Sequence, residues 1–157
     1  MTNAVRNRVK IPERAETPII INGDMQIAQR GTSTTDVGST EGYITVDRFN
    51  FNQNGNPSAR FTVTQDSDVP SGYGFVNSMK LDCTTADTSV AAGSFHTVEY
   101  RFEGQDTQLF KKGTSNAYPM TVAFWIKSSV TGTAVVELAD DDNTRPVSYT
   151  HLTLPTK

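Results

Sequence analysis

Short stretches of this chain alternate between apolar and polar residues, which is the pattern of β-strands with one buried face. Phe61 and Val63, for example, fall on one face of their stretch, with polar side chains opposite. Turn-forming residues separate the stretches, and Asn54-Gly55 is a pair that favours tight hairpin turns. The pattern predicts strands over residues 19–21, 43–51, 59–65, 78–84, 94–102 and 132–138.

Three segments depart from this alternation. Residues 120–127 are apolar on both faces, which predicts a central strand covered on two sides and places Trp125 in the core. Residues 31–42 are expected to form a polar loop, and residues 105–111 fit one helical turn that Gly113 closes. Because short strands separated by turns favour an all-β sandwich or barrel, we expect a jelly-roll β-sandwich that contains this helical turn.

The length of 157 residues fits one domain. Residues 1–18 mix charges with prolines and are expected to form an N-terminal arm or linker, whereas residues 19–145 are expected to form the sandwich. The one cysteine, Cys83, excludes an internal disulfide framework. It follows Met79 and Leu81 at strand spacing, so we expect its thiol to be buried with them.

The last residues break the strand pattern of the rest of the chain. Residues 146–156, with the sequence PVSYTHLTLPT, resemble the in-frame translation of a transposase-type sequencing adapter. We therefore interpret residues 146–157 as a non-native tail and expect the sandwich to be truncated at its C-terminal end, after Arg145. A sandwich cut behind a strand that ends at Leu138 leaves an unpaired edge, which predicts a marginally stable or aggregating protein.

Charge and hydropathy exclude several classes of partner. The formal net charge of -3 predicts no general attraction to nucleic acid or to anionic membranes. No apolar run approaches the roughly 18 residues of a membrane span, so we expect no membrane insertion. Three cations near the N-terminus, Arg6, Arg8 and Lys10, are not followed by an apolar stretch, so no signal peptide is predicted.

Residues suited to catalysis are scarce in this sequence. Of the two histidines, His151 lies in the tail, and His96 lies on a predicted strand beside aromatic residues, where we expect a packed structural role. The nucleophile signature G-x-S-x-G does not occur, and no pair of carboxylates stands out for glycoside hydrolysis. The sequence therefore predicts a protein that is not an enzyme.

Oxygen ligands are densest at residues 140–143, where Asp140, Asp142 and Asn143 are candidate ligands of a structural calcium ion. Calcium takes roughly six to eight oxygens, and four adjacent residues cannot all face one ion. The spacing of an EF-hand loop is also absent, so a solvated acidic loop is the simpler interpretation. A calcium site would need ligands from other loops, and we expect no other cofactor.

Aromatic rings in loops are the candidate contacts for a sugar, because the CH-rich faces of pyranoses stack on such rings. Tyr73, Phe75 and Tyr118 lie in or beside loops that contain Gly and Pro, so we take them as candidate ligand-binding residues. The alternative interpretation is that each ring anchors its own loop. These three positions are nevertheless better candidates than Trp125, which falls in the doubly apolar segment.

Two stretches carry longer motifs. The first reads IINGDMQIAQRG over residues 20–31 and is followed by Gly42-Tyr43 and Asp47-Arg48-Phe49. The second reads HTVEYRFEG over residues 96–104 and is followed by VAFWIKS over residues 122–128. These stretches resemble the patterns N-L-I-N-G-D/N-M-x-I-x-Q-R-G, G-Y-x-x-D-R-W/F, I-E-G and L-S-F-W-x-K-S of a family of phage virion proteins found in tail fibres and related appendages.

The resemblance implies a galactose-binding-like jelly roll and a non-catalytic phage virion module for structure or host-surface contact. It also implies other virion proteins as partners, a homotrimer in the full-length form, a cell-surface glycan as ligand and a virion assembled in the host cytoplasm. The alternative is a carbohydrate-binding module of a secreted or enzyme-appended bacterial protein, and a lyase or hydrolase fragment ranks third. Within the motifs, we expect Arg30 and Asp47 to pair as a structural clamp.

Overall fold

Antiparallel strands make up most of the regular structure of this chain, so the all-β prediction is confirmed. The computed structural model describes residues 19–39, 41–55, 57–140 and 145–154. It divides the chain into two units, Met1–Pro119 and Met120–Lys157. The boundary between the units lies inside the 19–145 stretch that was expected to form one sandwich.

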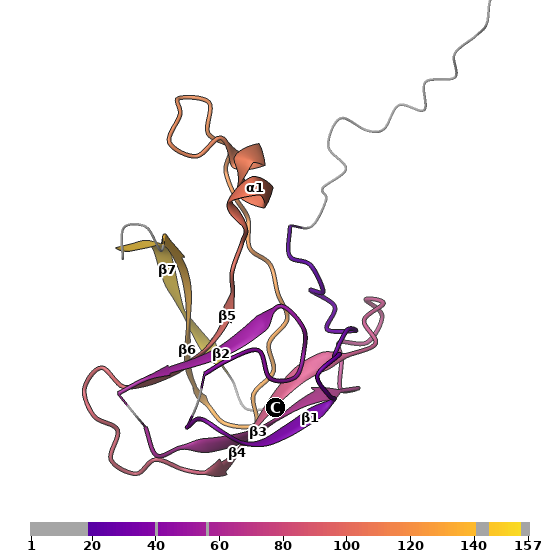
Figure 1. Ribbon diagram of the computed structural model, residues 1–157, viewed down its shortest axis with the longest axis vertical. Helices are drawn as coiled ribbons and strands as arrows, with labels where there is room; N and C mark the ends of the chain where they lie inside the picture. The colour runs from indigo at the N-terminus through magenta and orange to yellow at the C-terminus, as the bar shows by residue number, and fades with distance from the viewer. Residues whose placement is uncertain (1–18, 40, 56, 141–144, 155–157) are drawn as a thin grey trace, which may run out of the picture. The chain divides into compact units, whose positions relative to one another are not determined.

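The first unit contains two antiparallel sheets, whose strands far apart in sequence lie side by side (Figure 1). Its strands are β1 (Ser33–Val37), β2 (Phe49–Asn54), β3 (Arg60–Asp66), β4 (Ser78–Thr85) and β5 (Phe95–Tyr100). The strand order is β1-β3-β4 in one sheet and β2-β5 in the other. Of these pairs, β3 and β4 are consecutive in sequence and can be joined by one short connection, whereas other strands separate β1 from β3 and β2 from β5.

The core lies between these two sheets. Val37 of β1, Phe51 of β2 and Val63 of β3 are at most 5% exposed and pack together. Phe61 lies two residues from Val63 on the same face, and its ring centroid is 5.8 Å from that of Phe51. The alternation predicted for β3 is therefore confirmed, and it is the inner face of each sheet that forms the sandwich core.

The inner face of β4 is less covered than its sequence predicts. Leu81 pairs with Val63 and Cys83 pairs with Phe61, so both follow the inward side of β3. Leu81 is nevertheless 38% exposed and Cys83 is also exposed, so the prediction of a buried thiol is wrong. The physical reason is that β4 ends a three-stranded sheet that faces a sheet of only two strands.

Two predicted elements at the start of the chain differ in the structure. Residues 19–21 belong to a turn instead of a strand, because Asn22 takes a φ of +60° directly afterwards. The predicted polar loop over 31–42 contains the edge strand β1, whose residues Ser33 to Asp36 are largely polar. An edge strand can be held by a single buried residue, here Val37. Its sequence then shows little alternation of apolar and polar residues, so the pattern did not predict a strand.

The predicted helical turn is confirmed. It consists of α1 (Gly104–Thr107) and the single 3₁₀ turn η1 (Gln108–Phe110). Lys111, with a φ of +50°, closes the segment through a 3.1 Å hydrogen bond from its N–H to the carbonyl of Gln108. The closure thus occurs two residues before Gly113, the residue expected to perform it.

The second unit contains the antiparallel pair β6 (Gly132–Asp140) and β7 (Arg145–Leu154). In β6 the predicted inward positions Ala134 and Val136 are half-buried, whereas Val135 between them is 57% exposed. The strand β7 coincides with most of the adapter-like tail, and its residues pair with those of β6 with a register shift between Leu138 and Ala139.

The predicted central strand over residues 120–127 is absent from the structure, and this prediction is wrong. The segment has no regular structure, and Trp125, expected in the core, is 57% exposed. Phe124 and Ile126 are 48% and 51% exposed. A strand that is apolar on both sides needs two paired neighbours and two covering layers, and the β6–β7 hairpin of its own unit pairs only with itself.

Candidate functional site

Residues from both motif stretches meet in the first unit, although they are distant in sequence. We call this cluster the motif joint and define it by Asn22, Arg30, Asp47, Arg48, Tyr100 and Glu103. The segment before β2 brings Asp47 and Arg48 to the cluster, and the end of β5 brings Tyr100. The register of the β2–β5 pair fixes this meeting, since Phe49 pairs with Tyr100.

The side chain of Asn22 connects two backbone segments of the joint. Its Nδ2 donates to the carbonyls of Ile27 and Asp47, each at 2.9 Å, and its Oδ1 accepts the N–H of Ile27 at 2.8 Å. The backbone adds a hydrogen bond from the Asp47 N–H to the Ile27 carbonyl at 2.9 Å. Asn22 has a φ of +60°, which asparagine tolerates better than most residues.

Arg30 and Asp47 form the predicted clamp. Nη1 of Arg30 lies 3.1 Å from Oδ1 of Asp47, and the N–H of Gln29 donates to the same oxygen at 3.3 Å. The guanidinium also lies 5.9 Å from the ring centroid of Tyr43. The Arg30 side chain is 54% exposed, so solvent screens the ion pair and its contribution to stability is about 0.2–1 kcal/mol.

A second ion pair of the joint was not predicted. Nη1 of Arg48 donates to Oε1 of Glu103 at 3.1 Å, and the guanidinium lies 5.7 Å from the ring centroid of Tyr100. Hydrogen bonding to Tyr100, and then to Glu103, raises the pKa of Arg48 above its ordinary value. The N–H of Ile21 donates to the Tyr100 hydroxyl at 2.8 Å, which ties the first motif to the second.

The turn of the first motif is also fixed to β3. Nε2 of Gln65 donates to the carbonyl of Met25 at 2.6 Å and to that of Gln26 at 2.9 Å. Met25 has a φ of +58° and Arg48 a φ of +75°, which are uncommon for residues with long side chains. Strained backbone persists only where the surroundings hold it, so the joint is a tightly determined part of the fold. In chemical terms its charges neutralise one another, which is the arrangement of a structural clamp.

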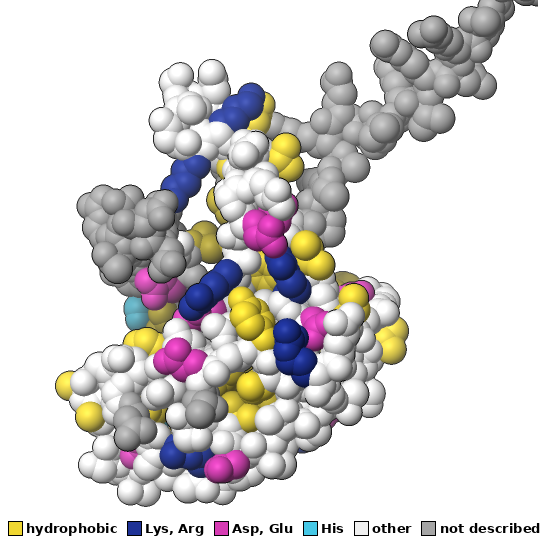
Figure 2. All heavy atoms as spheres, in the orientation of Figure 1, with side chains coloured by type: hydrophobic (Ala, Val, Ile, Leu, Met, Phe, Trp, Pro, Cys, Tyr) yellow, Lys and Arg dark blue, Asp and Glu magenta, His cyan; other side chains and the backbone are white. Residues whose placement is uncertain are grey.

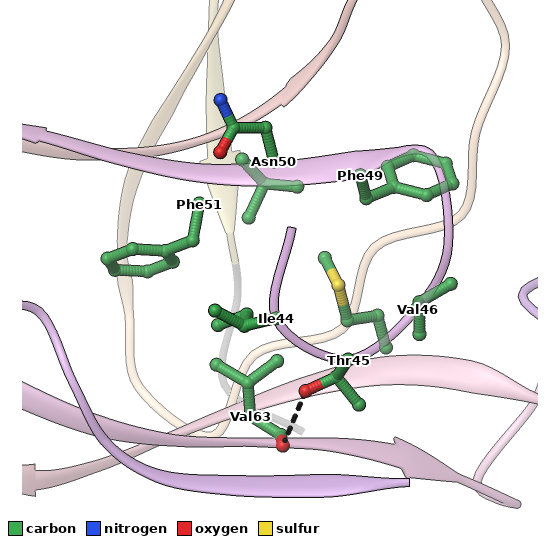
Figure 3. A pocket seen from close by; sticks show the side chains of 9 residues that line it. Ile44, Thr45, Val46, Phe49, Asn50, Phe51 and Val63 are labelled. Carbon is green, nitrogen blue, oxygen red and sulfur yellow. Dashed lines mark hydrogen bonds between the residues drawn. The ribbon is translucent and has the colours of Figure 1, made fainter. Parts of the chain in front are cut away.

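A small cavity lies inside the sandwich, and Figure 3 shows the side chains around it. Its volume of about 10 Å³ corresponds to about one water molecule, whereas ligand pockets are on the order of 300–1,000 Å³. Asn50 and Phe51 lie on opposite sides of β2, and Oδ1 of Asn50 is buried without a hydrogen-bond partner (Figure 3). The hydroxyl of Thr45 donates to the carbonyl of Val63 at 3.3 Å. This cavity is part of the core and cannot hold a sugar.

The three candidate sugar contacts do not share one segment. Tyr73 and Phe75 lie in the loop between β3 and β4, where Tyr73 is 62% exposed and Phe75 is half-buried. Tyr118 follows η1, and its hydroxyl accepts a hydrogen bond from Nζ of Lys111 at 3.1 Å. The same ammonium lies 4.7 Å from the ring centroid, so Tyr118 anchors its loop. Figure 1 places the β3–β4 loop and the α1 segment at separate edges of the first unit.

The candidate calcium ligands lie at the limit of what the structure describes. Asp140 ends β6, and Asp142 and Asn143 fall outside the described residues, so the calcium site stays a prediction. Elsewhere in the described part of the chain, no group of three or more His, Cys, Asp or Glu side chains is placed to hold a metal. Among the same residues, no helix has the length and apolarity to span a bilayer.

Neither the known protein families, the curated proteins nor the solved structures contain a match to this chain. The geometry of the chain and the motifs in its sequence are therefore what indicate its function. Within that geometry, the residues of the two motif stretches contact one another, whereas Tyr73, which is 62% exposed, lies in the β3–β4 loop, outside both stretches.

Proposed function

We propose that this protein is a non-catalytic phage virion module, from a tail fibre or related appendage, that serves assembly or host-surface contact. The observation that carries the proposal is the motif joint. Its contacts Arg30–Asp47, Arg48–Glu103 and Ile21–Tyr100 join residues 17, 55 and 79 positions apart. Residues that resemble one family pattern and also interlock in space are what a common structural module requires.

The proposed module has a galactose-binding-like jelly roll. Two facing antiparallel sheets, β1-β3-β4 and β2-β5, support this assignment. Such sandwiches carry their contacts with partners on loops and on sheet edges, because the inner faces are filled by the core. The exposed β3–β4 loop, with Tyr73 at 62% exposure, is the proposed point of contact with a host surface.

Assembly with other virion proteins is supported by the apolar surface of the first unit. Figure 2 shows apolar side chains between polar and charged ones on the face in view. Large apolar side chains exposed in this unit are those of Ile21, Ile27, Tyr43, Tyr73, Val76, Leu81, Val90, Phe95, Val98, Leu109 and Tyr118. Exposed apolar residues beside strand edges are typical of surfaces that partner chains cover.

Sedimentation velocity over a range of protein concentrations tests this proposal. We expect a concentration-dependent conversion to a defined homotrimer, because the exposed apolar side chains become buried between copies. The variant Val76→Thr, which adds a hydroxyl at a side chain 60% exposed in the β3–β4 loop, is expected to weaken the trimer. A protein that stays monomeric at every concentration would contradict the assembly role.

The alternative function is a carbohydrate-binding module, and the exposed ring of Tyr73 is the observation that favours it. A glycan array with the isolated protein tests it, together with the variants Tyr73→Ala and Tyr118→Ala. Saturable binding that Tyr73→Ala abolishes and Tyr118→Ala retains would support this function, because Lys111 already occupies the Tyr118 hydroxyl and ring. An array without any specific signal would exclude it.

A further inference from the structure

His96 of β5 lies between the two sheets of the first unit. Its ring centroid is 5.4 Å from that of Phe51 in β2 and 5.0 Å from that of Phe61 in β3. The two phenylalanines are themselves 5.8 Å apart, so the three rings form one cluster. Because Phe51 and Phe61 belong to different sheets, His96 contributes directly to the contact between them.

One nitrogen of His96 is enclosed without a partner. Its Nε2 is buried and has no hydrogen bond. On one side the space is closed by Gly38, where a Cβ would lie 3.3 Å from Nε2 and 2.6 Å from the carbonyl oxygen of Ala59. A neutral imidazole fits such a site, whereas an imidazolium would bring a charge between the rings of Phe51 and Phe61.

The charged groups around His96 come from three elements. Arg60 of β3 is held by hydrogen bonds from Nη1 to the carbonyls of Pro57 and Ala59, at 2.9 and 2.8 Å. Asp36 of β1 lies 3.8 Å from Nε of Arg60 but is largely exposed. Asp87, in the loop between β4 and β5, accepts hydrogen bonds from other groups, including the N–H of Ser58 at 3.0 Å.

These surroundings oppose protonation on balance. Burial is the largest influence on the imidazole and disfavours its charged form, and the nearby Arg60 acts in the same direction. The carbonyl of Gly38 and the carboxylate of Asp87 favour the charged form but do not outweigh burial, so the pKa of His96 lies below its ordinary value. Attraction of a cation to the phenylalanine rings also favours protonation, and it is weakest for phenylalanine among the large aromatic residues.

We propose that His96 is an acid-sensitive latch that holds the β2–β5 sheet on β3 while neutral and releases it when protonated. This inference goes beyond the proposed function, because it assigns the first unit a response to acid that assembly does not require. The release begins at one end of the sheet, since His96 pairs with Gln53 and the adjoining Asn54 pairs with Phe95. At the opposite end the motif joint holds Tyr100, whose hydroxyl accepts the hydrogen bond from Ile21.

Two measurements on the unmodified protein test the latch. NMR titration of the histidine ring protons, assigned with His151→Gln, is expected to show His96 titrating below its ordinary value of 6.5. Hydrogen exchange, corrected for intrinsic rates, is expected to show the Gln53–Asn54 and Phe95–His96 amides exchanging severalfold faster at about pH 5 than at about pH 7. The amides beside Tyr100 are expected to keep their protection.

The variant His96→Phe supplies the third arm of the test, because phenylalanine keeps the ring cluster without a titratable group. Its exchange pattern is expected to be the same at both pH values, whereas His151→Gln is expected to keep the acid response of the unmodified protein. Titration of His96 at or above 6.5 would overturn the proposal, as would an acid response that persists in His96→Phe. If that variant does not fold, the titration and exchange of the unmodified protein decide the question.

Discussion

Asn22 offers the sharpest test of the motif joint, because its single amide makes three hydrogen bonds across two segments. Replacement by glycine removes the amide but keeps access to the φ of +60°. Replacement by alanine removes the amide and also disfavours that φ. Comparison of the two variants therefore separates the hydrogen-bonding contribution from the backbone contribution.

The magnitudes follow from the exposure of the three bonds. The bond to the Asp47 carbonyl is partly buried and should contribute about 1 kcal/mol, while the two exposed bonds to Ile27 compete with water and together contribute about 1 kcal/mol more. Glycine adds about 0.5 kcal/mol through the entropy of the unfolded chain. Alanine instead adds about 1–2 kcal/mol for the left-handed backbone. We expect losses of about 2.5 kcal/mol for Asn22→Gly and about 3.5 kcal/mol for Asn22→Ala.

The assay is urea denaturation followed by far-UV circular dichroism, with linear extrapolation and an unchanged dependence on urea concentration. Asp24→Ala is the matched control, because among the described residues the Asp24 carboxylate, in the same turn, accepts a hydrogen bond only from the exposed Gln26 amide, at 2.8 Å. That variant should lose less than about 0.5 kcal/mol. A loss below about 0.5 kcal/mol for Asn22→Gly would refute the reasoning, and equal losses for glycine and alanine would refute the strained backbone.

Four further predictions concern the same unit. A double-mutant cycle of Arg30→Ala and Asp47→Ala, measured by denaturation, should give a coupling free energy of about 0.5 kcal/mol, which should decrease in high salt because solvent ions screen the pair. A coupling free energy that does not change with salt would contradict this screening. Val63→Ala, at a side chain 1% exposed, should cost about 2–3 kcal/mol in the same assay, and a near-neutral result would exclude a packed core there. Gly38→Ala should lower the thermal midpoint strongly, because its Cβ would lie 2.6 Å from a carbonyl oxygen and its φ is +128°, so an unchanged midpoint would refute this geometry. Hydrogen bonds from Ser89 and Ser58 lower the pKa of Asp87 in the folded protein. The carboxylate should therefore contribute its full stabilisation above the ordinary pKa of 3.8 and lose it as the pH falls through the lower pKa of the folded state. In thermal scans Asp87→Asn should remove this loss of stability in acid, and an acid profile identical to that of the unmodified protein would argue against it.

Strands with one buried face were predictable because alternation is a local signal. The face shared by Phe61 and Val63 was read correctly, since every second residue of β3 meets the opposite sheet. The Arg30–Asp47 pair was also predictable, because the two residues have opposite charges and lie in neighbouring parts of the first motif stretch, 17 positions apart. In both cases the information lies within a short stretch or a recognisable pattern.

The failures concern features that depend on distant parts of the chain. The apolar segment around Trp125 indicates a strand that needs neighbours, but its own residues do not determine whether those neighbours are present. The pair Arg48–Glu103 spans 55 positions and has no local pattern. The strand β1 was not predicted, because an edge strand buries few residues and shows little alternation. The thiol of Cys83 was wrongly predicted to be buried, because the sequence of β4 does not indicate how many strands the facing sheet contains.

The hydrogen bond between Ile21 and Tyr100 has a consequence for the order of folding. It joins positions 79 residues apart, and closing a flexible loop of that length costs about 4 kcal/mol in chain entropy beyond a constant. One exposed hydrogen bond cannot offset that cost, so we expect this contact to form only after the strands have brought its ends together. Attachment of the first motif would then be among the last steps of folding, so protection at this contact would report that the rest of the sandwich has already formed.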